Sequence, residues 1–287
     1  MHEDLVERIR FSNMPPEEDR THGNKEPKMN RSKSLLALNI MCPLLILLII
    51  GVLTRYALLI YDTLMEPVVL VLTGFFNFQI FGNWFQILRH RSVLPRGNVS
   101  RNMVTSMNGE AWCSQCHIVQ PVRVYHCPLC NRCVARRDHH CFALGVCIGQ
   151  CNHAHFVYLL GHAALSCCIF AFFAFRYIYT VYDPPAGDYF FPVVLYHYIV
   201  NGTADGYQSS VTFLFNFALH LTVSLSGFCA FNVYLICRNR TQYEFSRGRN
   251  VVRPDHNARV FGPYFPLQLL IPIHCSPVKA MSPEKIV

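Results

Sequence analysis

Long apolar segments alternate with polar ones along the 287-residue chain. A helix of about 20 apolar residues crosses the roughly 30 Å hydrocarbon core of a bilayer, and four of the segments are long enough. They cover residues 35–53, 67–88, 156–181 and 211–237. The pattern therefore predicts an all-α polytopic membrane protein with four transmembrane helices.

Two further apolar segments do not fit a regular spanning helix. Residues 189–200 are too few to cross a bilayer and contain Pro192, so we expect an interfacial or lumen-facing element there. The segment Val260–Ile273 contains three prolines, which break the helical hydrogen-bond ladder.

Positive charge predicts the orientation of the helices. Of 25 Lys and Arg residues, 23 lie in three segments, residues 1–34, 89–155 and 238–287. The intervening loops, 56–66 and 182–210, contain none. Because cytoplasmic loops are enriched in Lys and Arg, both termini and residues 89–155 are predicted to be cytosolic. The net charge of +8 thus reflects topology, and no nucleic-acid partner is expected.

The same pattern divides the chain into five parts. Residues 1–34 carry many charges and no apolar core of a signal peptide, so they are predicted to be a disordered cytosolic tail. Residues 35–88 hold the first two spans, 89–155 form a cytosolic cysteine-rich domain, and 156–237 hold the last two spans with a lumenal loop. Residues 238–287 form a cytosolic C-terminal region.

Composition supports a membrane protein and points to one unusual segment. Hydrophobic residues make up 52% of the chain and charged residues only 15%, which argues against a soluble protein. Eight of the fourteen cysteines lie between Cys113 and Cys151. Disulfides are not expected in the reducing cytosol, whereas paired C-x2-C motifs are typical of zinc sites.

Counting the possible ligands suggests two metal sites and a spare pair. Two tetrahedral sites use eight of ten candidates, which leaves one cysteine and one histidine. A thiol next to a histidine that a carboxylate orients is a typical nucleophile, and Asp138, His139 and Cys141 fit these roles. The count alone leaves a purely structural zinc module open. The candidates are Cys113, Cys116, His126, Cys127, Cys130, Cys133, His139, His140, Cys141 and Cys147.

Residues 113–156 resemble the cysteine-rich domain of the DHHC family of protein S-acyltransferases. The resemblance rests on the initial C-x2-C, the sequence Asp138-His139-His140-Cys141, Cys147-Ile148-Gly149, and Asn152-x3-Phe156. Two spans before the domain and two after it also match. Dense identity is confined to these 44 residues, while the overall layout extends over residues 35–262.

The resemblance implies two structural Zn2+ ions and a thioester mechanism. One ion is expected on Cys113, Cys116, His126 and Cys133, the other on Cys127, Cys130, His140 and Cys147. Cys141 is then the nucleophile that takes a long-chain acyl group from acyl-CoA and passes it to cysteines of proteins at the membrane. His139 is implied as its base and Asp138 as the orienting carboxylate, and the implied location is the endoplasmic reticulum or Golgi membrane.

Three arginines near the site are predicted to contact CoA, because guanidinium groups pair well with phosphate. They are Arg123, Arg136 and Arg137.

Several positions depart from the family pattern. Phe142-Ala143 replaces the usual Pro-Trp, and Thr241-Gln242-Tyr243-Glu244 replaces Thr-Thr-x-Glu. A catalytically silent, membrane-anchored zinc-binding adaptor is therefore the alternative. A RING-like ubiquitin ligase is disfavoured, because the ligands are packed into 35 residues without a long central loop.

Overall fold

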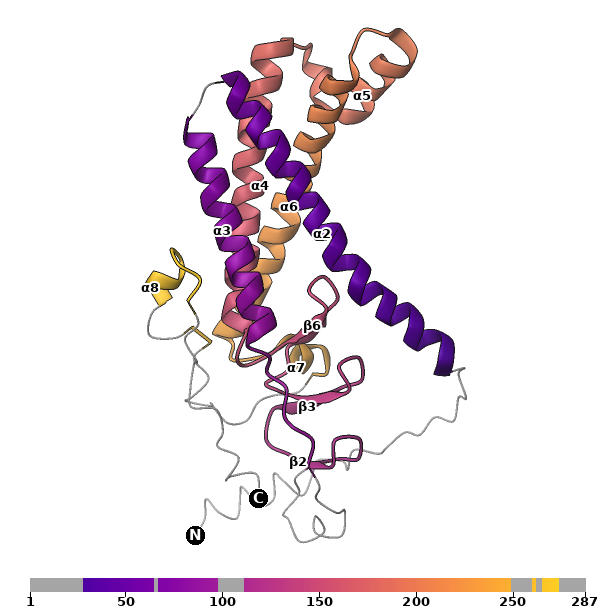
Figure 1. The fold of residues 1–287 in the computed structure, drawn as a ribbon, viewed down its shortest axis with the longest axis vertical. Helices are drawn as coiled ribbons and strands as arrows, with labels where there is room; N and C mark the ends of the chain where they lie inside the picture. The colour runs from indigo at the N-terminus through magenta and orange to yellow at the C-terminus, as the bar shows by residue number, and fades with distance from the viewer. Residues whose placement is uncertain (1–27, 65–66, 98–110, 249–259, 262–264, 274–287) are drawn as a thin grey trace. The chain divides into compact units, whose positions relative to one another are not determined.

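The structure is a computed structural model that describes residues 28–64, 67–97, 111–248, 260–261 and 265–273. Contacts divide the chain into two units, Met1–Ala37 and Leu38–Val287. The cysteine-rich segment and all helices except the first turns of α2 belong to the second unit. The described residues are mostly helical (Figure 1).

Within the described residues, four helices are long and apolar enough to cross a membrane, as the hydrophobic pattern predicted. Proline occupies the first position of α3. A backbone N–H at this position has no partner within the helix, so the missing N–H of proline costs no hydrogen bond. Helix α2 begins within the predicted tail, while residues 1–27 lie outside the described residues. The four helices are α2 (Lys28–Leu64), α3 (Pro67–Arg89), α4 (His153–Tyr182) and α6 (Gly206–Cys237).

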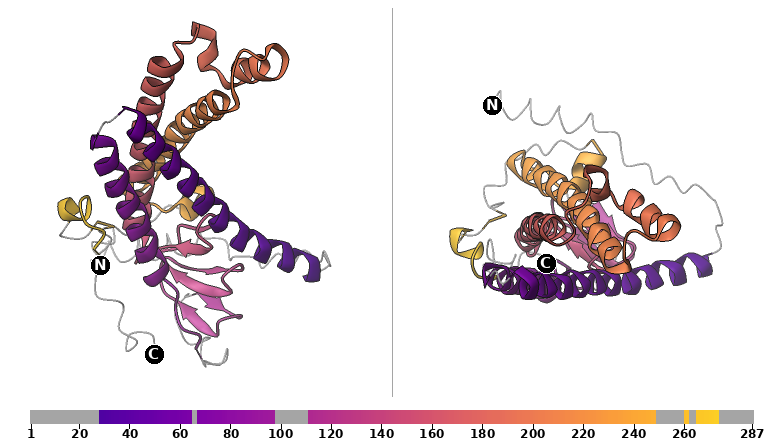
Figure 2. Two further views of the ribbon diagram at one scale, coloured as in Figure 1. Left: turned by 45° about the horizontal axis from the view of Figure 1, so that its top comes forward. Right: turned by 90° about the horizontal axis from the view of Figure 1, so that it is seen from above.

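Helix α4 is the most buried of these helices. About three-fifths of its apolar stretch is buried, compared with 33% for α3 and 11% each for α2 and α6. It lies between α3 and α6 and packs against both (Figure 2). Large apolar side chains such as Leu48, Val71 and Val223 remain exposed on the other helices. In water such surfaces would be unfavourable, whereas lipid tails solvate them, so this distribution fits a bilayer.

The cysteine-rich segment folds into three short antiparallel hairpins. They are β1 (Ala111–Cys113) with β2 (Ile118–Gln120), β3 (Val124–Cys127) with β4 (Arg132–Ala135), and β5 (His139–Cys141) with β6 (Val146–Ile148). None of these six strands exceeds four residues, and two-stranded hairpins of this size are marginally stable alone. The segment therefore needs support from the helices or from bound metal.

The chain between α4 and α6 forms short helical elements. A 3-10 turn, η2 (Ala186–Tyr189), is followed by α5 (Phe191–Tyr196) and a π-helical turn, η3 (His197–Asn201). Pro192 stands in the first turn of α5, where proline is tolerated. The predicted short element at residues 189–200 is thus helical and too short to span.

Two short helices follow the last membrane-length helix. Helix α7 (Gln242–Ser246) begins with a capping box, and α8 (Phe265–Gln268) is a single turn. The backbone carbonyl of Leu270 beyond α8 accepts a hydrogen bond from Gln79 of α3 at 2.6 Å, and Pro272 accepts one from Gln86 at 2.8 Å. Prolines prevent this segment from forming a spanning helix, and side chains of α3 donate hydrogen bonds to the backbone carbonyl groups that a helix would otherwise have paired.

Candidate metal centres and cysteine nucleophile

Two groups of three cysteines and one histidine lie close together, and they are the two predicted ligand sets. In each group the possible ligand atoms all lie within 4.8 Å of one another. The groups are Cys113, Cys116, His126 and Cys133, and Cys127, Cys130, His140 and Cys147. The structure therefore brings together every residue predicted as a metal ligand.

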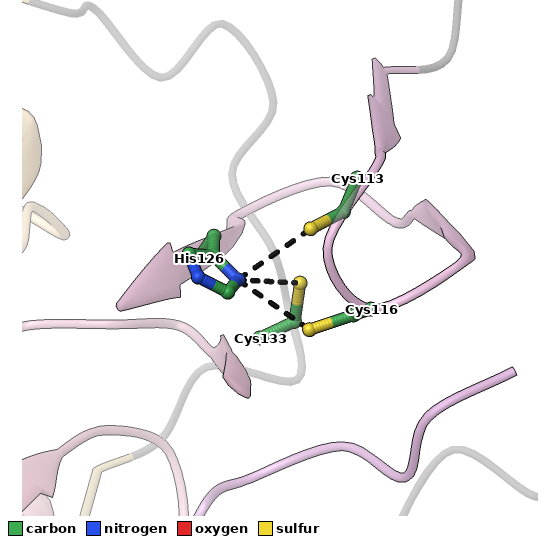
Figure 3. Close-up of side chains that lie close together, drawn as sticks. All are labelled: Cys113, Cys116, His126 and Cys133. Carbon is green, nitrogen blue, oxygen red and sulfur yellow. Dashed lines mark hydrogen bonds between the residues drawn. The ribbon is translucent and has the colours of Figure 1, made fainter. Parts of the chain in front are cut away.

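The distances in the first group fit a tetrahedral metal ion. Nδ1 of His126 lies 3.5 Å from Sγ of Cys113, 3.4 Å from Sγ of Cys116 and 4.0 Å from Sγ of Cys133 (Figure 3). Zinc bonds of about 2.3 Å to sulfur and 2.0–2.1 Å to nitrogen place the two ligand atoms roughly 3.6 Å apart at the tetrahedral angle. Three thiols and one imidazole are also a donor set that zinc prefers.

The second group has the same geometry. Nδ1 of His140 lies 3.3 Å from Sγ of Cys130, 3.7 Å from that of Cys147 and 3.8 Å from that of Cys127. Hydrogen bonds from Cys130 and Cys147 lower the pKa of Cys127 far below the usual range of a thiol. A thiolate is the form that binds metal, so this group favours a cation.

Local backbone geometry explains how each C-x2-C supplies two ligands. The residue after the second cysteine of each motif has a positive φ, 54° at His117 and 50° at Asn131. A left-handed residue there reverses the chain into the next strand, which leaves both sulfurs on the inside of the turn. Asparagine and histidine are among the non-glycine residues that adopt this conformation most often.

The alternation of side chains along a strand separates the candidate metal ligand from the candidate reactive residues. Successive residues of a strand point to opposite faces. In β5, His140 belongs to the second metal group, so His139 and Cys141 share the other face. This face meets the helices, where the His139 ring lies 5.0 Å from the ring of Phe156 and 6.1 Å from that of Phe228.

Asp138 and His139 form a close pair beside Cys141. Nδ1 of His139 lies 2.8 Å from Oδ2 of Asp138, which leaves Nε2 for the thiol of Cys141. Burial alone would lower the pKa of His139, but hydrogen bonds with Asp138 and Cys141 outweigh it and raise this pKa to about 9. A protonated imidazole next to a thiol is the arrangement that stabilises a thiolate.

The segment after α6 binds the second carboxylate oxygen and the backbone carbonyl of Asp138. The backbone N–H of Gln242 donates to Oδ1 of Asp138 at 2.7 Å, and that of Tyr243 donates to its carbonyl at 3.0 Å. Burial would raise the pKa of this carboxyl group, but hydrogen bonds from His139 and Gln242 help to lower it. Asp138 is therefore held ionised and oriented toward His139.

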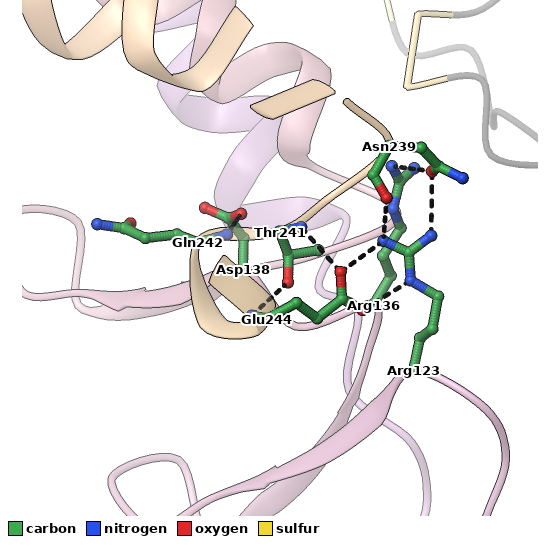
Figure 4. Close-up of polar contacts among 7 residues, drawn as sticks. All are labelled: Arg123, Arg136, Asp138, Asn239, Thr241, Gln242 and Glu244. Atoms are coloured by element: carbon green, nitrogen blue, oxygen red, sulfur yellow. Dashed lines mark hydrogen bonds and ion pairs between the residues drawn. The ribbon is translucent and has the colours of Figure 1, made fainter. Parts of the chain in front are cut away.

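A buried polar network holds the same segment in place (Figure 4). Thr241 and Glu244 form the capping box of α7, and Glu244 also makes an ion pair with Arg123 at 2.8 Å. Arg136 donates to Oδ1 of Asn239 at 3.3 Å. The motif around Thr241 departs from the family pattern, and no role was predicted for Glu244 or Asn239.

The three arginines predicted to contact CoA all interact with the chain itself. Arg123 and Arg136 are buried in the network just described. Arg137 donates to the carbonyl of His126 at 3.3 Å, and its guanidinium lies 4.8 Å from the ring centre of Tyr243. These contacts give the arginines a structural role, and contact with CoA stays a prediction.

Cys141 lies at the wall of an apolar cavity between the helices. The cavity has a volume of about 300 Å³, and side chains of α2, α3, α4 and α6 line it. Around Cys141 the wall is formed by Trp84, Leu144 and Phe156, which pack into one buried cluster with it. Trp84 was not predicted as part of this site, because nothing near it in the sequence relates it to Cys141.

These features define a membrane protein with a candidate cysteine nucleophile and two candidate metal centres. Residues 106–249, half of the chain, match the family described as DHHC palmitoyltransferase. The chain therefore belongs to the DHHC palmitoyltransferase family, as the resemblance indicated.

Several individual proteins are similar to the same region. Palmitoyltransferase PFA3 of Debaryomyces hansenii is 29% identical over 170 residues, which cover 58% of this chain and 38% of the relative. Human palmitoyltransferase ZDHHC2 is 27% identical over 161 residues, 55% of this chain and 39% of the relative. Mouse palmitoyltransferase ZDHHC4 is 33% identical over 145 residues, 47% of this chain and 42% of the relative. The matches thus span about two-fifths of the relatives' length.

Proposed function

We propose that the protein is a protein-cysteine S-palmitoyltransferase that works through an acyl thioester on Cys141. The observation that carries this proposal is the position of Cys141. Its strand places it on the same face as His139, and it lines the apolar cavity between the helices. A nucleophile, its base and a site for a hydrocarbon chain are thus combined in one place.

The first half-reaction transfers the acyl group to the enzyme. His139 accepts the proton of the Cys141 thiol, and the thiolate attacks the carbonyl carbon of a long-chain acyl-CoA. A new thioester forms on Cys141, the bond to the CoA sulfur breaks, and CoA leaves with the proton from His139. Asp138 keeps the imidazole oriented and stabilises its protonated form.

The second half-reaction passes the acyl group to a protein. A cysteine thiol of the substrate protein gives its proton to His139 and attacks the thioester on Cys141. The substrate thioester forms, and the Cys141 thiolate is released and reprotonated. Each half-reaction uses the same base, which is typical of a ping-pong mechanism.

The cavity explains why such an enzyme is embedded in the membrane. Burying a chain removes apolar surface from water and contributes about 0.8 kcal/mol per CH2 group. Its lining is almost entirely apolar, from Trp84 beside Cys141 to Ile60 and Phe173 farther along the helices. The acyl chain lies there while the CoA portion stays in water.

Zn2+ is the metal we assign to both Cys3His groups, with a structural role. When bound, each ion cross-links ligands from different hairpins and so supplies stability that these short strands lack. The first group joins β1 to β3 and β4, and the second joins β3 to β5 and β6. The second ion therefore also fixes the strand that carries Cys141.

We further propose that the active site and both termini face the cytosol. The support is the distribution of Lys and Arg, of which 23 of 25 lie in the three segments assigned to that side. Acyl-CoA and the cysteines of cytosolic or membrane-bound proteins are accessible there. The endoplasmic reticulum or Golgi membrane is the proposed location.

Acyl labelling of the purified protein tests the function. We expect palmitoyl-CoA to label the protein through a bond that hydroxylamine cleaves, and to transfer the label to a cysteine-containing acceptor. Absence of label from protein that holds two zinc ions per chain would overturn the proposal. That result would instead support the zinc-binding adaptor.

A further inference from the structure

The segment between α4 and α6 contains an acceptor sequence for N-linked sugars. Asn201-Gly202-Thr203 has the form Asn-x-Ser/Thr, and the chain contains three other sequences of this form, at Asn30, Asn98 and Asn239. Sugars of this kind are added to surface positions of chain that is exposed to the secretory lumen. Orientation and exposure therefore decide which of the four is modified.

The acceptor amide and the hydroxyl group of the Asn201 sequence are both on the surface. Asn201 ends the π-helical turn η3, and Gly202 follows it with a φ of 61°, so the backbone leaves the helix at the acceptor. Asn201 and Thr203 are both exposed. An enzyme that adds a bulky sugar chain can thus reach the whole sequence.

The other three sequences lie in the segments that carry the positive charge and are proposed to be cytosolic. The structure also encloses one of them. Oδ1 of Asn239 accepts hydrogen bonds from Arg123 at 3.1 Å and from Arg136 at 3.3 Å, and Thr241 is fully buried. Asn239 is therefore inaccessible for a reason that is independent of orientation.

The length of α6 keeps the acceptor loop away from the hydrocarbon core. This helix has 32 residues, which extend about 48 Å at 1.5 Å per residue, whereas the core is only about 30 Å thick. Even at a tilt of 40°, near the upper limit for membrane helices, α6 covers about 37 Å. Arg238 follows its last residue, and Gln208, Ser209 and Ser210 occupy its first turns. The polar first turns therefore extend beyond the core, and the loop that joins them lies at the end of the helices away from the hairpins (Figure 1).

Acidic side chains on both sides of the acceptor also indicate an aqueous environment. Asp205, which caps α6 four residues after Asn201, is exposed. Asp188 pairs with His197 at 3.2 Å, just before the acceptor. Ionisable groups are rare in the hydrocarbon region. We therefore interpret this short helical element as facing the lumen.

An apolar patch next to the acceptor gives the sugar a physical role. Tyr198, Ile199 and Val200 immediately precede Asn201 and are all exposed. Exposed apolar surface in water favours association with other proteins. A sugar chain on the next residue is bulky and hydrophilic, so it covers this patch.

We propose that Asn201 carries an N-linked oligosaccharide in the lumen of the endoplasmic reticulum. The inference rests on the proposed function, because it requires the orientation proposed there. The donor is an oligosaccharide on a polyprenyl diphosphate. Nδ2 of Asn201 forms a bond to C1 of the first sugar, the bond from C1 to the diphosphate oxygen breaks, and the amide loses a proton as the lipid diphosphate leaves.

Digestion of the full-length protein from eukaryotic cells with a peptide N-glycosidase tests the inference. We expect digestion to increase the electrophoretic mobility of the wild type. Asn201→Gln and Thr203→Ala should migrate like the digested wild type, with or without digestion, whereas Thr203→Ser keeps the acceptor sequence and should keep the sugar. A wild type whose mobility does not change overturns the inference.

Asn239→Gln is the matched control, because it removes a sequence of the same form from a segment proposed to be cytosolic. The change in mobility on digestion should persist in this variant. Sugar that remains on Asn201→Gln would overturn the inference, since it would place another of the four sequences in the lumen. Acyl labelling of the same samples tests the proposed function separately, and Asn201→Gln should be labelled like the wild type. A wild type that carries the sugar but takes no acyl label would refute the proposed function and leave this inference intact.

Discussion

Arg123 and Glu244 form a buried ion pair across 121 positions of the sequence. Nε and Nη2 of Arg123 each lie 2.8 Å from a carboxylate oxygen of Glu244, so the pair is bidentate. The two side chains are 5% and 0% exposed, respectively. The pair therefore joins the hairpins to the segment that holds Asp138.

Removing one partner of this pair should destabilise the protein strongly. Glu244→Ala leaves the guanidinium of Arg123 buried without its counter-charge, which typically costs about 3–5 kcal/mol. We expect a markedly lower unfolding temperature in detergent for this variant. The double variant Arg123→Met with Glu244→Leu should recover much of the loss, because no charge is left unpaired. Equal stability of wild type and Glu244→Ala would contradict this role.

Two cysteine substitutions should separate metal binding from catalysis. Cys141→Ser removes the nucleophile but no predicted metal ligand, so labelling by acyl-CoA should be abolished while zinc content remains at two per chain. Cys147→Ala removes a ligand of the second group. We expect this variant to lose one zinc ion and stability, as measured by metal analysis and thermal unfolding. Equal zinc loss in both variants would refute the ligand assignment.

Asp138→Asn should impair the chemistry without removing metal. The amide cannot stabilise a protonated His139 and favours the wrong tautomer, an effect that lowers the rate of a comparable triad by about 10⁴-fold. We expect the rate of acyl labelling to fall by at least about a hundredfold, with zinc content unchanged. Asp188→Asn is a suitable control, since Asp188 pairs with His197 in the loop between α4 and α6. A comparable loss in the control would indicate a general structural effect.

If the proposed activity is correct, filling the cavity should change the length of acyl chain that the protein accepts. Ala163 of α4 lines the cavity beyond Leu159 and Leu160, so Ala163→Phe places a ring in the path of the chain. We expect labelling by hexadecanoyl-CoA to fall relative to that by a shorter acyl-CoA. Ala230→Phe adds the same ring to an exposed position on α6 and should leave the ratio unchanged. An unchanged ratio in Ala163→Phe would mean that the chain does not occupy the cavity.

The spans and the presence of a metal-binding segment were predictable because both are local or periodic features of the sequence. An uninterrupted apolar segment specifies a membrane-length helix, and C-x2-C motifs specify a metal-binding turn. The division of the ligands between Cys113 and Cys147 into two sets came from the resemblance to the DHHC family, because motif spacing alone does not say which residues share an ion.

Contacts between distant segments were not predictable in this way. Arg123 was predicted to contact CoA because it is a basic residue near the site. Its partner in the structure, Glu244, lies 121 positions away, and nothing near Arg123 in the sequence identifies it. The polar side chains in the cavity were not predicted, because hydropathy averaged over a helix conceals single polar residues such as Thr73 and Ser166. Trp84 was overlooked for a similar reason, as its proximity to Cys141 depends on how α3 packs against β5 and β6. These relationships require the tertiary structure.

His126 and Cys127 are consecutive in β3 yet belong to different metal groups. Their separation depends on the two-residue period of the strand, so inserting or deleting one residue near them would turn each side chain toward the wrong group. The turn between β2 and β3 at Val122 is exposed and holds no metal ligand, so it has no such constraint. Related sequences should therefore vary in length at this turn and stay constant from His126 to Cys133, and a library of single-residue insertions should tolerate changes in the same place.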